Sequence, residues 1–187
     1  MPRTKVQFQQ MKDERKLSIL ESSLPLFAIH TVDTVSIDMI CQKAKCSHGL
    51  AYHYFKNVEQ IYDELLKSKT YKNLFSSLNI IDLNKEAYPQ IEELVKKLIS
   101  IIKQSKTEVA FALIIVNDES KKSLYSSFVK LVDAGQKEGS VTAGKPEDIV
   151  STFYLLVKGL YQTILNQKHP SIRVPSIDNI LKIFKRY

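Results

Sequence analysis

The sequence predicts an all-α protein of about nine helices. Apolar side chains recur at three- and four-residue spacing along most of the chain, as they do on the buried face of a helix. Five glycines and six prolines in 187 residues favour helices over a strand-and-turn architecture. We expect an N-terminal three-helix domain over residues 1–56 and a second helical domain over residues 57–187.

Residues 36–55 carry the most specific pattern, two short helical segments joined by a tight turn. Ser36 and Ser47 can each cap a segment, because a serine hydroxyl accepts a hydrogen bond from a free amide at a helix start. Ile40 and Cys41 fall on one face of the first segment. The second segment carries small, polar and aromatic side chains where a core helix would be apolar. This is the pattern of a helix-turn-helix unit, whose second helix enters the major groove of DNA.

Residues 15–66 resemble the N-terminal domain of the TetR family of bacterial transcriptional regulators. The segment GLAYHYFKNVE is the most specific part of the resemblance. Thr31 and Lys45 stand where the family usually has glycine, and Val58 replaces a common lysine. The matching positions are Leu26, Phe27, Ala28, Ile40, Ala44, Ser47, Gly49, Tyr52, Phe55 and Asn57.

The resemblance implies that the outer side of the second segment contacts double-stranded DNA. His48 can donate to a phosphate or to a guanine edge, and Tyr52 and Lys56 are expected at phosphates. Base contacts specify and phosphate contacts position, so Leu50 and Ala51 join His48 as candidates for sequence preference. The predicted DNA-binding residues are Ser36, Gln42, Lys43, Ser47, His48, Leu50, Ala51, Tyr52, His53 and Lys56.

Helices outside this unit follow from apolar periodicity. They are expected at about 10–30, 57–79, from Pro89 to about 102, at 109–116, 118–138, 146–167 and 176–186. The first has an apolar stripe at Leu17, Leu20, Leu24 and Phe27. Its basic residues Lys12, Arg15 and Lys16 fit phosphate contacts and a plain solvated face equally well. The segment 109–116 is apolar on every side, which fits a buried helix.

The two C-terminal helices carry wide apolar faces, and Gly159 would allow a close backbone approach. On a monomer they would expose a larger apolar patch than soluble monomers usually carry. We therefore predict a homodimer with a four-helix bundle; the alternative is that these helices complete the monomer core. The predicted interface residues are Ile149, Phe153, Leu156, Leu160, Ile164, Ile177, Leu181 and Phe184.

The resemblance also implies an effector pocket in the C-terminal domain, whose occupation changes the spacing of two recognition helices and releases DNA. Candidate lining residues, each of a type that is more often plain core, are Phe75, Phe111, Ile115, Tyr125 and Phe128. The expected function is a ligand-responsive repressor, released from a palindromic operator by a small apolar effector. The alternative is a DNA-bound structural or partner-recruiting protein of the same fold without an inducer.

The net charge and the sequence motifs indicate which other functions are to be expected. The net charge of +7 suits a polyanionic partner, although residues 1–60 hold only eight Lys and Arg against six Asp and Glu. The chain has no Gly-rich phosphate loop, G-x-S-x-G elbow or H-E-x-x-H pair. We therefore expect no enzyme, cofactor or metal site. Because no 18-residue apolar run and no apolar signal core are present, we expect a cytoplasmic protein with no membrane partner.

Cys41 and Cys46 are the two cysteines of the chain. Their C-x4-C spacing, followed by His48 and His53, fits no common zinc site. We expect both to be small core residues, with a redox switch as the alternative.

Overall fold

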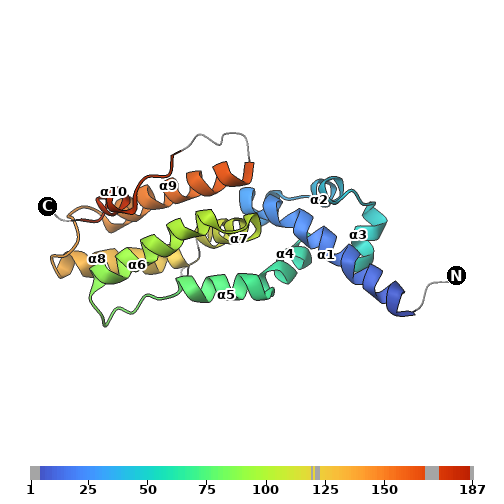
Figure 1. Ribbon diagram of the computed structural model, residues 1–187, viewed down its shortest axis with the longest axis horizontal. Helices are drawn as coiled ribbons and strands as arrows, with labels where there is room; N and C mark the ends of the chain where they lie inside the picture. The colour runs from blue at the N-terminus through green and yellow to red at the C-terminus, as the bar shows by residue number, and fades with distance from the viewer. Residues whose placement is uncertain (1–4, 119, 121–122, 167–172, 186–187) are drawn as a thin grey trace. The chain divides into compact units, whose positions relative to one another are not determined.

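A computed structural model describes residues 5–118, 120, 123–166 and 173–185. Within these ranges the protein is all-α, as predicted, with an isolated antiparallel bridge between Val141 and Lys185 in place of any strand. No helix among the described residues is long and apolar enough to cross a membrane. The α-helices (Figure 1) are α1 (Lys5–Ile29), α2 (Ile37–Ala44), α3 (His48–Tyr54), α4 (Val58–Leu66), α5 (Lys69–Leu78), α6 (Ala87–Ser100), α7 (Lys106–Asn117), α8 (Leu124–Lys137), α9 (Pro146–Asn166) and α10 (Ile177–Leu181).

The chain forms two compact units, Met1–Tyr71 and Lys72–Tyr187. The boundary lies inside α5, whereas the sequence pattern placed it after residue 56. The first unit is longer because α4 packs against α1 and belongs to the same small core.

The first unit is built on α1, which packs against both α2 and α4. Its core holds Ile19, Ile40, Phe55 and Ile61, each at most 1% exposed. The predicted stripe on α1 was wrong at Leu17, which is 55% exposed. The inward face passes through Ile19 and Ser23 instead, on the side of α1 that packs against α2 and α4.

Lys16 closes the rim of this small core. Its ammonium lies 5.6 Å from the centre of the Phe55 ring and 3.3 Å from the Glu64 carboxylate. The ammonium of Lys67 also reaches Glu64, at 3.2 Å. Lys16 is therefore engaged within the protein, which favours the structural reading of this residue over a phosphate contact.

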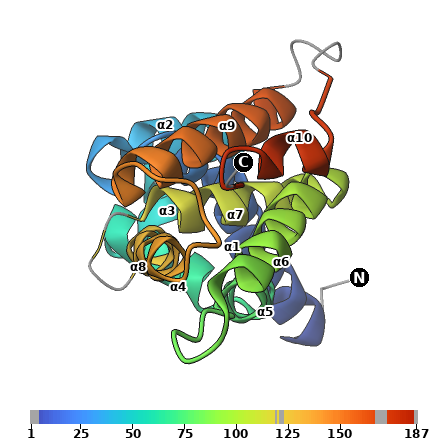
Figure 2. The ribbon, with the colours of Figure 1, turned by 90° about the vertical axis from the view of Figure 1, so that its left-hand side faces the viewer.

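The second unit is built around α7, which runs inside it and packs along α9 (Figure 2). Every residue from Val109 to Val116 is buried, which confirms the expected all-apolar segment. An aromatic cluster forms the other half of the core. The Phe128 ring stacks on Phe184 at 5.3 Å and meets Phe153 edge-on at 5.8 Å.

Several predicted helix bounds were wrong. The helix expected at 57–79 is two helices, because α4 ends at Leu66 and α5 starts at Lys69. The helix expected from residue 118 begins at Leu124, where the Ser123 hydroxyl accepts the amide of Ser126. The last helix ends at Leu181 rather than near 186, and Lys185 then bridges to Val141.

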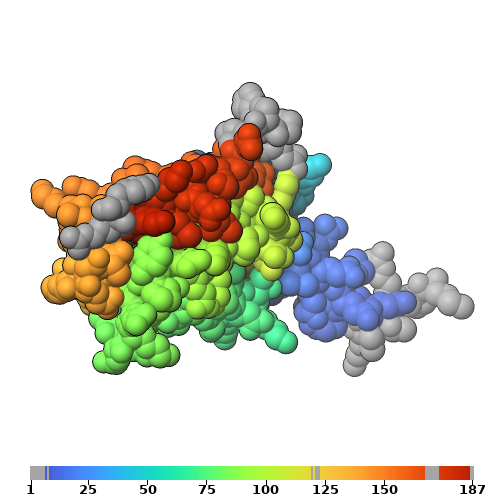
Figure 3. Space-filling model, turned by 60° about the vertical axis from the view of Figure 1, so that its left-hand side comes forward, coloured from blue at the N-terminus to red at the C-terminus, as the bar shows by residue number. Residues whose placement is uncertain are grey.

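The C-terminal helices contribute to the core of the protomer itself, which corrects half of the predicted dimer interface. Phe153 and Phe184 are fully buried, and Leu160 and Leu181 are each 8% exposed. α9 packs along α7 and α8, and α10 packs on α6 (Figure 3) and brings Phe184 onto the aromatic cluster. The other four predicted residues, Ile149, Leu156, Ile164 and Ile177, are half-buried.

Lys45 supplies a test of the turn between α2 and α3. Its φ of 51° is the one positive value at a non-glycine residue in the described ranges. A side chain in this region costs about 1–2 kcal/mol, and glycine avoids most of that cost. Lys45→Gly should therefore raise the free energy of unfolding in urea by about 0.5–1 kcal/mol. Lys45→Ala, which loses the charge but keeps the strain, is the control; equal stability of the two variants would contradict the account.

Candidate nucleic-acid interface

The unit formed by α2, its turn and α3 is held by local hydrogen bonds. The Ser36 hydroxyl accepts the amide of Met39 at 3.2 Å, and the Ser47 hydroxyl accepts the amide of Leu50 at 3.2 Å. Both predicted caps are present. Between them, Lys45 in the left-handed conformation lets the Cys46 amide bond the Cys41 carbonyl at 3.0 Å. These bonds end α2 and start α3 in a new direction, which is the helix-turn-helix geometry.

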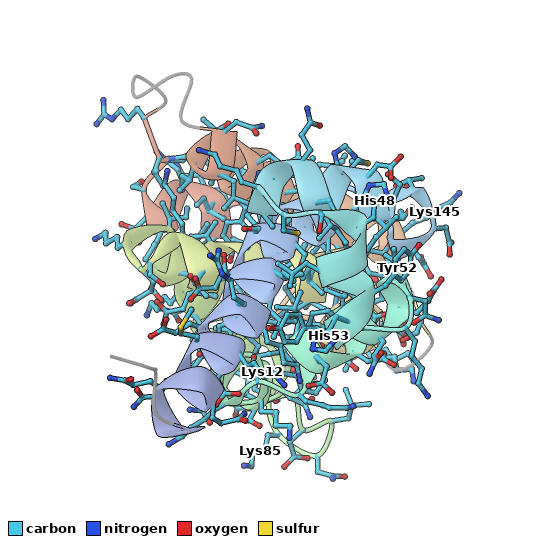
Figure 4. All side chains as sticks on the ribbon, turned by 90° about the vertical axis from the view of Figure 1, so that its right-hand side faces the viewer. Lys12, His48, Tyr52, His53, Lys85 and Lys145 are labelled. Atoms are coloured by element: carbon cyan, nitrogen blue, oxygen red, sulfur yellow. The ribbon has the colours of Figure 1, made fainter. Side chains whose placement is uncertain are left out.

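One side of α3 faces solvent and carries polar and aromatic groups. His48, Tyr52 and His53 project from it along the helix (Figure 4), and Tyr52 is 54% exposed. Gly49 has nothing within 4 Å of the place where a Cβ would stand. The exposed members of the predicted DNA-binding set are Ser36, Gln42, Lys43, Ser47, His48, Tyr52, His53 and Lys56.

Ala51 is a correction to the predicted base-reading set. It is fully buried, and so cannot lie at a base edge. Phe55 follows at one helical turn and is also buried, so the two residues define the inward side of α3. Leu50, which was also predicted at base edges, is half-buried at the side.

A hollow of about 450 Å³ lies between α1 and α3. Lys12 and Arg15 of α1 line it together with Leu50 and His53 of α3; Figure 4 shows Lys12 and His53 on their two helices. The sequence left the roles of Lys12 and Arg15 open. Both cations therefore lie beside the helix that a polyanion would contact.

His48 has a partner that the sequence analysis missed. Its Nε2 lies 2.9 Å from a carboxylate oxygen of Asp38, and both side chains are more than half exposed. Asp38 is in the first turn of α2, so the pair joins the two helices across the turn. An exposed pair of this kind adds little stability. The interaction instead holds the imidazole beside the N-terminal end of α3, and any anion that binds His48 must compete with Asp38.

Lys56 is held just beyond the end of α3. The Asn57 side chain accepts the amide of Gln60 at 3.0 Å, and the Gln60 side chain accepts the amide of Lys56 at 2.6 Å. This resembles a capping box, except that the return bond goes to Lys56 instead of Asn57. The start of α4 thereby fixes the backbone that carries the Lys56 ammonium.

Comparison with known proteins agrees with this geometry. No family model matches the chain. A curated relative, the uncharacterized HTH-type transcriptional regulator YhgD of Bacillus subtilis (strain 168), is 25% identical over 187 positions, covering 93% of this chain and 96% of the relative. The crystal structure of apo AibR matches with a TM-score of 0.60 at 15% identity, covering 92% of this chain and 99% of AibR.

A bacterial regulatory protein of the TetR family from Rhodococcus RHA1 matches with a TM-score of 0.55 at 13% identity, covering 91% of this chain and 97% of that one. The chain has the TetR fold. In this fold the helix-turn-helix lies in the first unit and a helical domain follows, as in Met1–Tyr71 and Lys72–Tyr187 here.

The two cysteines of the helix-turn-helix are free thiols, Cys41 buried and Cys46 half-buried. Burial, and then a hydrogen bond with Cys46, raise the pKa of the Cys41 thiol to about 11. Because the thiolate is the reactive form, Cys41 is held in its unreactive state at neutral pH. No cluster of three or more metal-ligating side chains occurs among the described residues.

The five effector-pocket residues predicted from the TetR resemblance lie at different places in the described part of the second unit. Phe111 and Phe128 are buried core residues. Phe75 and Ile115 line a hollow of about 10 Å³, which holds no more than one water molecule. Tyr125 lines another, larger cavity in the second unit.

Gly49 and Ala51 provide a matched test of the orientation of α3. Gly49→Ala should raise the free energy of unfolding by roughly 0.5–1 kcal/mol, because the methyl group enters open space on a helix. Ala51→Leu should lower it by about 1–3 kcal/mol, because the core has no room for a larger side chain. Urea unfolding of both variants measures the difference. The reverse order would mean that α3 is rotated and its outer surface misassigned.

Proposed function

We propose that this protein is a transcriptional regulator that binds double-stranded DNA through α3. The observation that carries the proposal is the combination of a doubly capped helix-turn-helix with an α3 surface of His48, Tyr52 and His53. Such a helix fits the major groove, and its exposed side chains reach base edges and phosphates. The name of the Bacillus subtilis relative, an HTH-type transcriptional regulator, supports the same reading.

Cations around α3 supply the phosphate contacts in this proposal. Lys56 follows the helix, Lys43 lies on α2, and Lys12 and Arg15 lie across the hollow on α1. The neutralisation of phosphates by such groups makes binding fall steeply with salt. Lys16 is not included, because Glu64 and Phe55 already engage it.

A two-fold dimer would match a palindromic operator, because half-site spacing mirrors the symmetry of the protein. The outer side of α9 suits such contact. Leu155 is 70% exposed, and Gly159, one turn later, has open space where a Cβ would stand. Thr152 is exposed one turn earlier on the same side. Together with the half-buried Leu156, these residues form an apolar strip whose centre is thin enough for helices to approach closely.

We also propose that the protein represses transcription and that a small molecule releases it from DNA. This part of the proposal rests on the resemblance to the TetR family and on the presence of a cavity in the second unit. The direct test of the DNA-binding function is selection of bound sequences from a random duplex pool. Enrichment of a palindrome is the expected result, and no enrichment with folded protein would overturn the proposal.

Tyr52 and His48 should separate phosphate contact from base reading. Tyr52→Ala should weaken binding to selected and random duplexes alike. It should also lower the slope of log affinity against log salt concentration by about one unit, as expected for a lost phosphate contact. His48→Ala should weaken the free energy of binding to the selected duplex by about 1–3 kcal/mol and leave binding to random duplexes unchanged. Lys69→Ala, which removes an exposed cation from α5, is the control. Fluorescence anisotropy at two salt concentrations measures all three; unchanged binding by both α3 variants would place the interface elsewhere.

Neighbouring positions on α9 should test the dimer surface. Gly159→Glu puts a charge on the exposed strip and should give folded monomers in sedimentation. Leu160→Glu puts the same charge into the protomer core, where Leu160 is 8% exposed, and should unfold or aggregate the protein. Circular dichroism separates the two outcomes. A Gly159→Glu variant that still sediments as a dimer would rule out this side of α9.

A further inference from the structure

A cavity of about 460 Å³ lies in the second unit between the end of α7, the start of α8 and α9. Val116 and Leu155 give it apolar walls, and Tyr125, Ser151 and Tyr154 bring three hydroxyl groups. Sequence periodicity did not predict it, because its walls come from three helices that meet only in the folded unit. Its volume suits a small organic molecule.

Tyr154 is the first sign that the cavity is built for a polar ligand. Its side chain is 3% exposed, and its hydroxyl is the one buried side-chain polar atom in the described ranges without a hydrogen-bond partner. Leaving a buried hydroxyl unpaired lowers stability, so native structures rarely do so. The neighbouring hydroxyl of Tyr125 is already engaged by Ser151 at 2.9 Å. Tyr154, whose side chain lines the cavity, therefore carries an unpaired hydroxyl group.

Lys158 is the second sign. It lies one turn after Tyr154 on α9, lines the same cavity and pairs with no carboxylate among the residues the structure describes. The carboxylate of Asp118, also in the wall, is engaged by Ser120, whose amide lies 2.9 Å and whose hydroxyl 3.2 Å from its oxygens. The uncommitted groups of the cavity are thus a cation and a hydroxyl donor.

We propose that this cavity binds a small carboxylic acid with an apolar body. The carboxylate accepts from the Tyr154 hydroxyl and pairs with the Lys158 ammonium, and the body lies against Val116 and Leu155. Burial raises the pKa of Tyr154, so its phenol keeps the proton that it donates. Charge-assisted hydrogen bonds of this kind are stronger than neutral ones. The binding site stands on the cavity alone, whereas its role as the effector site rests on the proposed function.

Matched probes test the charge of the ligand. Butyrate, octanoate and 4-phenylbutyrate are titrated into the whole protein by calorimetry without DNA, and the tightest acid is then compared with its primary amide and its primary amine. We expect at least one acid to bind with a Kd below about 1 mM. The amide should bind about ten-fold more weakly or worse, and the amine should not bind. Failure of all three acids, or equal affinity of acid and amide, would overturn the proposal.

Variants test the two residues. Lys158→Met should lower the affinity for the acid about ten-fold and leave the affinity for the amide unchanged, because only the acid pairs with the ammonium charge. Tyr154→Phe should weaken the binding of both ligands, because it removes the hydroxyl donor. It should also raise the melting temperature of the protein without ligand, because that hydroxyl is unpaired. Lys130→Met, an exposed position on α8 outside the cavity, is the control. Unchanged acid affinity in either cavity variant would contradict the assignment.

A DNA-binding measurement tests whether the acid site also regulates the protein. Anisotropy of the selected duplex is measured with and without the tightest acid. Loss of DNA affinity in the parent but not in Lys158→Met supports the effector role. Acid binding with unchanged DNA affinity would overturn that role and leave both the acid site and the DNA-binding proposal in place.

Discussion

The burial of Ala51 and Phe55 against the small first core is the constraint on which the α3 surface depends. These residues lie one helical turn apart, so they fix the rotation of α3 about its axis. His48, Tyr52 and His53 are exposed on the rest of the helix surface. Lys16 and Glu64 close the rim beside Phe55 and hold α1 and α4 to the same core. A short helix with few contacts of its own thereby presents a defined surface.

Local chemistry made much of this unit predictable. The caps at Ser36 and Ser47 follow from side-chain hydrogen bonding within three residues, and both are present. Ala51 was misassigned because a small residue on a helix of seven residues leaves the apolar periodicity ambiguous. The break between α4 and α5 was missed because neither glycine nor proline marks Lys67 and Ser68. The Asp38–His48 pair joins two helices, and no short-range rule reports it.

Tertiary contacts decided the second unit. The apolar face of α9 was recognised, but a sequence does not say whether such a face meets its own chain or a second copy. The fold of α10 onto α6 answered part of the question, because it buries Phe184 with Phe153 and Phe128. The part of α9 that stays exposed is a strip at Leu155 and Gly159, which is narrower than the predicted apolar face. The unpaired hydroxyl of Tyr154 could not be recognised from the sequence. It becomes apparent only when the three helices that form the cavity are packed together.

The central claim is that α3 is the surface that meets DNA, and NMR tests it most directly. Backbone amide shifts of the labelled protein are followed as a selected duplex is added. The account predicts that the largest changes fall between Ser47 and Lys56, with smaller ones near Lys12 and Arg15. Changes confined to Lys72–Tyr187, with α3 unaffected, would contradict it.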